Sequence, residues 1–180
     1  MHALVVYESM YGNTMRIAEA IAAGLAGHMI VETVEVSEAP HAIAPDVDLL
    51  VVGGPTHAHG MTSAQSRANA ATKTPTPVIS QGIGIREWLE QVRPEGRATP
   101  AVTFDTRIKG PQILTGSAAN GYASKLDGAG FRVTAPAESF FVSVTASTDQ
   151  GLLDGEHGRA RAWGEELGAT LASRVAIPVG

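Results

Sequence analysis

Short apolar runs alternate with amphipathic stretches along this chain. Residues 3–7 form an unbroken apolar run that is β-branched at its centre, which is typical of a strand buried on both faces of a parallel sheet. Ile17, Ile21 and Leu25 then recur at intervals of four residues, which predicts a helix with one apolar face. The chain therefore begins as a strand, a polar loop and a helix.

The same alternation continues to the end of the chain, with an edge strand where Glu32 and Glu35 alternate with apolar residues and a last strand that Pro136 interrupts. The further predicted strands span residues 30–36, 48–53, 100–104, 131–133 and 139–142. The further predicted helices lie at residues 63–71, 85–92 and 117–128, and after Asp154. This order predicts an α/β fold of right-handed βαβ units, in which ligands bind beyond the carboxyl ends of the strands.

Composition narrows the classes of function. The chain has 180 residues, of which 44% are hydrophobic, so we expect a single domain over residues 1–180. Because it contains no cysteine, thiolate catalysis, disulfides and iron–sulfur clusters are excluded, and redox chemistry would need a bound cofactor. The net charge of −5, without a basic block, argues against nucleic acid as a partner. No run approaches the roughly 20 apolar residues that span a bilayer, so we expect a cytoplasmic protein without membrane contact.

The loop between the first strand and the first helix is rich in hydrogen-bond donors. Its donor side chains are Ser9, Tyr11, Asn13 and Thr14, and Gly12 permits a tight turn. A strand that leads into a helix in this way directs backbone N–H groups at one point, which favours an anion. The loop lacks the lysine of the G-x-x-x-x-G-K-[ST] loop and the G-x-G-x-x-G pattern. Two interpretations remain: neutral donors that bind a phosphate, or an ordinary turn whose polar residues cap the helix.

The run Ser9-Met10-Tyr11-Gly12-Asn13-Thr14 resembles the [ST]-x-[TSY]-G-x-T loop of flavodoxins, which holds the phosphate of FMN. The same loop occurs behind the first strand of the related flavodoxin-like quinone reductases. The resemblance implies a flavodoxin-like, doubly wound, five-stranded parallel sheet in the order 2-1-3-4-5, with helices on both faces. It also implies non-covalently bound FMN as the cofactor.

Two later loops extend the resemblance. Pro55-Thr56-His57-Ala58-His59-Gly60 resembles the flavodoxin loop that covers one face of the isoalloxazine ring, with His57 and His59 where Trp or Tyr is common. Gly60 would supply a flexible peptide beside flavin N5. The loop after residue 104 matches the third flavin loop by position, and its predicted cofactor-binding residues are Asp105, Thr106, Arg107 and Gly110. A metal at the two histidines is disfavoured, because no carboxylate is nearby in the loop.

The third loop departs from the family pattern. It carries Arg107 and Lys109 where many flavodoxins have a stacking Tyr and acidic residues. One interpretation is a solvated basic loop. The other is that Arg107 lies near the N1–C2 edge of the flavin, where it would favour the anionic reduced form and make the reduction potential less negative.

The segment 61–82 is longer than the corresponding flavodoxin connection, so we interpret it as an insertion beside the cofactor, either a lid or surface packing. We expect Trp88, in the helix that follows, to belong to the core.

The predicted function is electron transfer by bound FMN, with no catalytic side chain, because the flavin supplies the chemistry. One alternative is an FMN-dependent NAD(P)H or quinone oxidoreductase; the partner would then be a small acceptor rather than a redox protein. A second is a flavin-free interaction module. A receiver domain is excluded, because Tyr7-Glu8 and Gly53-Gly54 replace its acidic pair and its phosphorylated Asp. The sequence predicts no oligomeric state.

Overall fold

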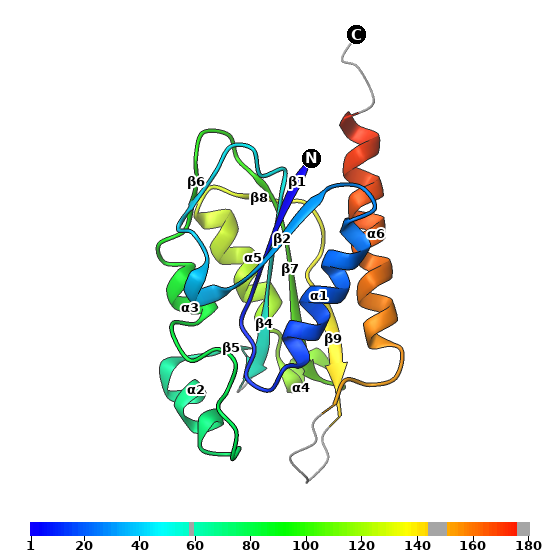
Figure 1. Ribbon diagram of the computed structural model, residues 1–180. Coiled ribbons are helices and arrows are strands. Elements are labelled where there is room, and N and C mark those ends of the chain that lie inside the picture. Colours follow the sequence, from blue (N-terminus) through cyan, green and yellow to red (C-terminus); the bar gives the residue numbers. More distant parts are fainter. Residues whose placement is uncertain (58–59, 144–150, 176–180) are drawn as a thin grey trace.

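The computed structural model describes residues 1–57, 60–143 and 151–175. Its main sheet is parallel and runs in the order β2-β1-β4-β7, with β8 and β9 both paired to the outer side of β7 (Figure 1). These strands are β1 (His2–Tyr7), β2 (Ile30–Glu35), β4 (Leu49–His57), β7 (Pro100–Ile108), β8 (Arg132–Val133) and β9 (Glu138–Val142). The order confirms the predicted 2-1-3-4-5 arrangement, with the last strand divided around Pro136 as expected.

Shorter elements complete the strands. β5 (Gly60–Met61) pairs antiparallel with the end of β4. β3 (Ala42–Ile43) and β6 (Arg93–Pro94) form a separate parallel pair, and η1 (Val36–Glu38) is a single 3-10 turn.

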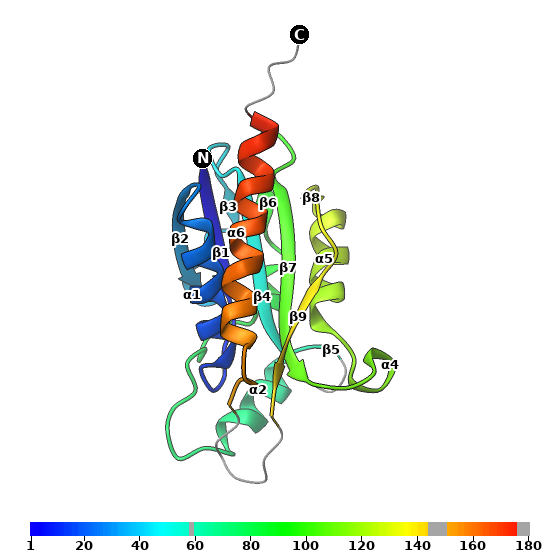
Figure 2. The same ribbon diagram turned by 90° about the vertical axis from the view of Figure 1, so that its right-hand side faces the viewer.

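Helices cover both faces of the sheet, as predicted. α1 (Asn13–Leu25) and α6 (Glu156–Val175) lie on one face, and α3 (Ile85–Trp88) and α5 (Ala118–Gly128) lie on the other (Figure 2). α2 (Ala64–Ala71) and α4 (Gln112–Thr115) lie beyond the carboxyl ends of the strands. No helix within the described part of the chain is long and apolar enough to cross a membrane.

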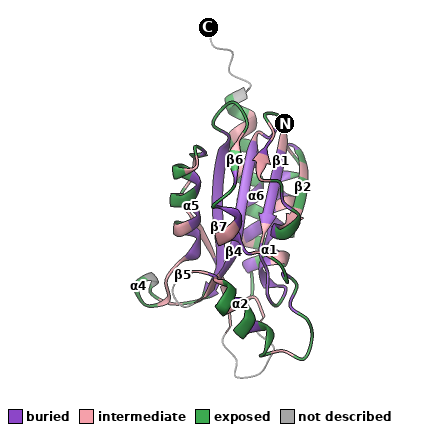
Figure 3. Cartoon of the chain, turned by 90° about the vertical axis from the view of Figure 1, so that its left-hand side faces the viewer, coloured by how far each residue is buried: buried purple, intermediate pink, exposed green. Residues whose placement is uncertain are grey.

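The unbroken apolar run of β1 follows from burial on both faces. Ala3 and Val5 pack into the cluster beneath α1 and α6, whereas Leu4 and Val6 pack into the cluster beneath α3 and α5. Successive side chains of a strand point to opposite faces, so neither set can be polar. The buried layer accordingly runs through the centre of the molecule (Figure 3).

The helix predicted over residues 85–92 is wrong in length, because α3 ends at Trp88. The backbone N–H groups of Gln91 and Val92 both donate to Trp88 O, which tightens the chain into a turn. Arg93 and Pro94 then extend to pair with β3. Trp88 is fully buried, as expected for the core, and its indole N–H donates to Pro40 O at 3.1 Å.

Two glycines bring α1 and α6 into close contact. A Cβ atom on Gly24 would collide with the Arg161 carbonyl oxygen, and one on Gly164 would collide with the Ile21 carbonyl oxygen. The two backbones therefore approach at a distance that only glycine permits.

The substitution Gly164→Ala is expected to lower the free energy of unfolding by about 1–3 kcal/mol, because the helices must separate to admit the methyl group. Gly158→Ala is the matched control, since no atom lies within 4 Å of the corresponding position in the same helix. That variant should gain about 0.5 kcal/mol from reduced backbone entropy. Urea unfolding measures both, and equal stability of the two variants would contradict the close contact.

Candidate functional site

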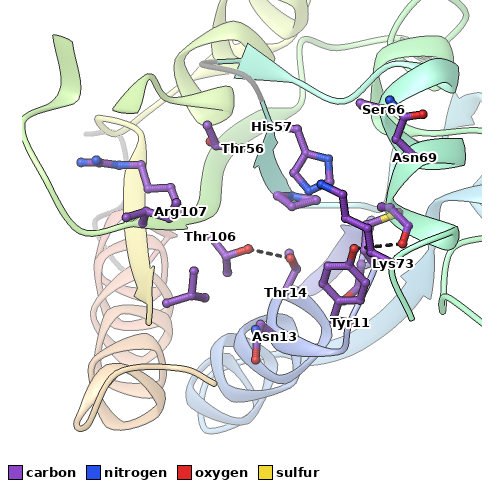
Figure 4. A pocket seen from close by; sticks show the side chains of 16 residues that line it. Tyr11, Asn13, Thr14, Thr56, His57, Ser66, Asn69, Lys73, Thr106 and Arg107 are labelled. Carbon is purple, nitrogen blue, oxygen red and sulfur yellow. Dashed lines mark hydrogen bonds between the residues drawn. The ribbon is translucent and has the colours of Figure 1, made fainter. Parts of the chain in front are cut away.

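A cavity of about 400 Å³ lies at the carboxyl ends of β1, β4 and β7 (Figure 4). All three predicted loops contribute to its wall. The predicted residues that line it are Ser9, Met10, Tyr11, Asn13, Thr14, Pro55, Thr56, His57, Thr106 and Arg107. Ile108, Val142 and one face of α2 complete it. The structure therefore brings together most of the predicted cofactor-binding residues.

The first loop presents the N-terminus of α1 to the cavity. Gly12 is the N-cap and has φ +92°, a left-handed conformation that favours glycine. Ser9 Oγ accepts hydrogen bonds from the backbone N–H groups of Gly12, at 3.2 Å, and Met15, at 3.3 Å. Because these two bonds use the lone pairs of the hydroxyl, its proton remains to be donated. The first turn of α1 carries no acidic residue, so its positive end is not neutralised locally.

Three further hydroxyls of the cavity have protein partners. Tyr11 donates from its hydroxyl to Ala70 O at 3.0 Å, so this group ties the first loop to α2. Thr14 and Thr106 share a hydrogen bond of 2.8 Å between their hydroxyls, and both side chains are buried. Because one hydroxyl donates in that bond, the proton of the other is available to a ligand.

The second loop continues β4. Thr56 donates from its hydroxyl to Asp105 Oδ2 at 3.0 Å and accepts from Ala118 N at 2.8 Å, so it also fixes the start of α5. His57 lies in the cavity wall, where burial and the positive charge of Lys73 lower the pKa of its imidazole, which favours the neutral ring. Gly60 pairs with His57 and is not among the described lining residues. Ala58 and His59 lie outside the described residues.

The side chain of Asp105, in the predicted third loop, accepts hydrogen bonds from other parts of the protein. Its side chain is fully buried, and Oδ2 accepts hydrogen bonds from Ser117 Oγ at 2.7 Å and Ala119 N at 3.1 Å. It therefore holds the first turn of α5, and it is not among the described residues that line the cavity.

The guanidinium of Arg107 points away from the cavity (Figure 4). Nη1 donates to Gly110 O at 3.1 Å and to Thr115 Oγ1 at 2.6 Å, and Nε donates to Ser139 Oγ at 3.0 Å. The group also lies over the Phe141 ring, 5.0 Å from its centroid. This geometry argues against the hypothesis that Arg107 directs its charge at the flavin, and it assigns Gly110 a role in holding Arg107.

The segment 61–82 contributes lining residues that were not predicted from the sequence. Ser66, Asn69, Ala70 and Lys73 all line the cavity. The spacing of Ser66, Asn69 and Ala70 places them on one face of α2, which begins with a capping box between Ser63 and Ser66, and Lys73 follows just after the C-cap Thr72. That polar face was the available signal, but the sequence did not show that the helix turns it inward.

The end of the same segment is bonded to the first loop. Ile79 N donates to Met10 O at 3.1 Å, and Ser80 N donates to Ser9 O at 2.9 Å. Ser9 N in turn donates to Ser80 Oγ at 2.9 Å. The end of the segment 61–82 is therefore fixed to the first loop by three hydrogen bonds rather than lying loosely on the surface.

Glu8 connects the end of β1 to the segment 61–82 through buried hydrogen bonds. Its fully buried carboxylate accepts hydrogen bonds from Thr62 Oγ1, at 2.6 Å, and Ile85 N, at 2.9 Å. Arg67 lies beside Glu8 and forms a bidentate ion pair with Glu87. Burial raises the pKa of Glu8, and the bonds from Thr62 and Ile85 with the charge of Arg67 oppose that rise.

The raised pKa of Glu8 predicts a pH dependence of stability. Between its ordinary value of 4.5 and its value in the folded protein, the native state holds a proton that the unfolded chain has lost. The free energy of unfolding must therefore fall as pH rises through this window. Glu8→Gln cannot titrate, so wild type should lose stability relative to the variant as pH rises from about 4 upward. Urea unfolding of both proteins across this range checks it, and a constant difference between them would be inconsistent with the raised pKa.

A second cavity, of about 290 Å³, lies between α6 and the connection from β8 to β9. Trp163, Leu167 and Pro136 are among its lining residues. Its described lining includes residues from the later turns of α6 but no helix N-terminus. It therefore lacks the helix N-terminus that favours an anion in the first cavity.

Comparison with known proteins gives the family context of this site. A family model described as a flavodoxin domain matches residues 4–67. No curated protein sequence matches the chain.

Solved structures resemble nearly the whole chain. An archaeal flavodoxin aligns over 95% of this chain and 99% of its own, with 16% identity and a TM-score of 0.62. Flavodoxin 1 of Bacillus cereus aligns over 92% of this chain and 96% of its own, also with 16% identity and a TM-score of 0.62. The rubredoxin oxygen:oxidoreductase of Desulfovibrio gigas aligns over 98% of this chain and 37% of its own, with 15% identity and a TM-score of 0.57.

These findings confirm two predictions from the sequence, the resemblance to the flavodoxin family and the flavodoxin-like fold. The structures establish the fold, and the match over residues 4–67 carries the family resemblance through the first two predicted loops. A flavodoxin domain implies FMN as the cofactor, as predicted.

Proposed function

We propose that this flavodoxin-like domain binds FMN in the cavity between its three loops and transfers electrons through it. The observation that carries the proposal is the convergence of all three loops at the N-terminus of α1, around one cavity of about 400 Å³. That volume lies within the range of small-molecule sites. No Asp or Glu is among the described residues that line it, so the cavity suits an anionic ligand.

The residues present fit the phosphate end of FMN. Asn13 and Thr14, in the first turn of α1, line the cavity, so the positive end of the helix dipole lies at its wall. Ser9 has a hydroxyl proton to donate, and the pair formed by Thr14 and Thr106 has another. Tyr11 is assigned a different role, because its hydroxyl is bonded to Ala70 and ties α2 to the loop.

The remaining wall suits a flat aromatic ring. Pro55 and His57 would lie on one side of the ring system, and Thr106 and Ile108 on the other. A neutral imidazole presents a flat surface without the cost of burying a charge. When FMN is bound it supplies the redox chemistry, and the protein orients it and limits the access of water and acceptors.

Thr14→Val is expected to weaken FMN binding about tenfold, because it removes a hydroxyl that donates to a charged group while keeping the shape of the side chain. Riboflavin, which lacks the phosphate, should bind wild type and variant equally. Fluorescence titration with each flavin measures the four dissociation constants. Equal weakening of both flavins would show that Thr14 does not contact the phosphate, and no retention of FMN by wild type would favour the flavin-free interaction module.

A second candidate is an oxidoreductase that acts on NAD(P)H or a quinone. The segment 61–82 favours it, because Ser66 and Asn69 of α2 and Lys73 just after it add donors to the cavity beyond those of the three loops. Steady-state oxidation of NADPH with a quinone acceptor separates the candidates. Negligible turnover by the FMN-loaded protein fits a carrier that needs a redox partner protein, whereas sustained turnover supports the oxidoreductase.

A further inference from the structure

We propose that Lys73, supplied by the segment 61–82, is the cation that stabilises bound FMN in its reduced, anionic form and so sets its reduction potential. The proposal rests on the proposed binding of FMN in the same cavity. It assigns to the segment 61–82 an electrostatic function that the sequence suggested for the third loop.

The side chain of Lys73 extends from the end of α2 into the cavity toward His57 (Figure 4). Its backbone N–H donates to Ala70 O at 3.1 Å, which closes the last turn of the helix and fixes where the side chain begins. The charge of Lys73 is near enough to His57 to contribute to the lowered pKa of that imidazole. A ring lying against His57 would therefore experience the same positive charge.

The position of α2 is fixed from three directions. The hydroxyl of Tyr11 donates to Ala70 O, and Arg67 is paired with Glu87 across the segment. Thr62, just before the helix, is bonded to the buried carboxylate of Glu8. These attachments come from Glu8 just after β1, from the first loop and from α3, so α2 sets the place of Lys73, two residues beyond its end, beside the first loop.

The charge of Lys73 is uncompensated within the cavity. Only Lys73 and Arg107 bring a full positive charge to the described residues of its wall, and no carboxylate lines it. Arg107 directs its guanidinium outward, with Asp105 Oδ1 4.0 Å from its Nε. Lys73 forms no ion pair with any residue in the described ranges. Its ammonium is therefore the charge available to a ligand.

The charge of Lys73 should affect the oxidised and the reduced state of the cofactor differently. The oxidised ring is neutral, whereas two electrons from an external reductant and one proton from water leave one negative charge on the reduced ring. A nearby ammonium attracts that charge and contributes little to the oxidised state. By linkage, a change in the ratio of the two affinities equals a change in the reduction potential.

The test compares Lys73→Gln with wild type, with Lys73→Arg as the conservative variant. Lys125→Gln is the control for charge, because Lys125 lies in α5 and pairs at 4.0 Å with Glu90, outside the cavity. Each protein is titrated with FMN and with riboflavin, and the midpoint potential of the bound FMN is measured by spectroelectrochemistry with dithionite as the reductant.

For Lys73→Gln we expect the affinity for reduced FMN to fall about tenfold, with the affinity for oxidised FMN changed less than threefold. A tenfold fall in the ratio of the affinities for reduced and oxidised FMN corresponds to a potential about 30 mV more negative for a two-electron couple. Lys73→Arg and Lys125→Gln should keep the potential of wild type.

Two results would overturn the proposal while leaving FMN binding intact. One is an unchanged potential in Lys73→Gln. The other is an equal loss of affinity for oxidised and reduced FMN with unchanged affinity for riboflavin, which would place Lys73 on the phosphate instead. If wild type binds no FMN, the proposed function itself fails and this inference fails with it, so the two failures are distinguishable.

Discussion

The buried carboxylate of Glu8 is the constraint from which the architecture of the site follows. A carboxylate with no exposed surface is costly unless donors surround it, and here the donors are the hydroxyl of Thr62 and the backbone N–H of Ile85. Glu8 directly precedes the first loop, so its partners must fold over the place where β1 ends. The segment 61–82 is thereby drawn against the N-terminus of α1, and α2 becomes one wall of the cavity.

The polar residues around the cavity divide into those that build it and those that face a ligand. Asp105 and Arg107 use their charges within the protein, on the start of α5 and on the third loop. Ser9 keeps a hydroxyl proton on the cavity side, the pair formed by Thr14 and Thr106 keeps another, and Lys73 has no ion-pair partner among the described residues. The result is a site whose anion-binding capacity comes from a helix terminus, two hydroxyls and one ammonium rather than from a cluster of arginines.

Much of the fold could be predicted from the sequence because its signals are local. The strand over residues 3–7 and the helix face of Ile17, Ile21 and Leu25 follow directly from periodicity, and parallel strand order followed from the family resemblance. The length of α3 could not be predicted, since pairing of residues 93–94 with β3 is a long-range interaction that ends the helix early.

The loops that form the candidate site could be predicted from the sequence, but the directions of their side chains could not. The three loops are contiguous motifs and all reach the cavity, but the direction of a side chain within a loop depends on distant partners. Arg107 illustrates this, because Ser139 and Phe141 draw its guanidinium outward from more than 30 positions along the chain. Lys73 is the opposite case, since a residue within the insertion 61–82 gains a place in the site only because α2 is held there.

Amide hydrogen exchange with and without FMN tests the central claim, that the three loops and α2 form one FMN site, most directly. The account predicts that FMN slows exchange at residues 9–15, 56–57, 66–73 and 106–108, with no change at residues 163–174 beside the second cavity. Protection confined to residues 163–174, or no protection at the loops when FMN is bound, would contradict it.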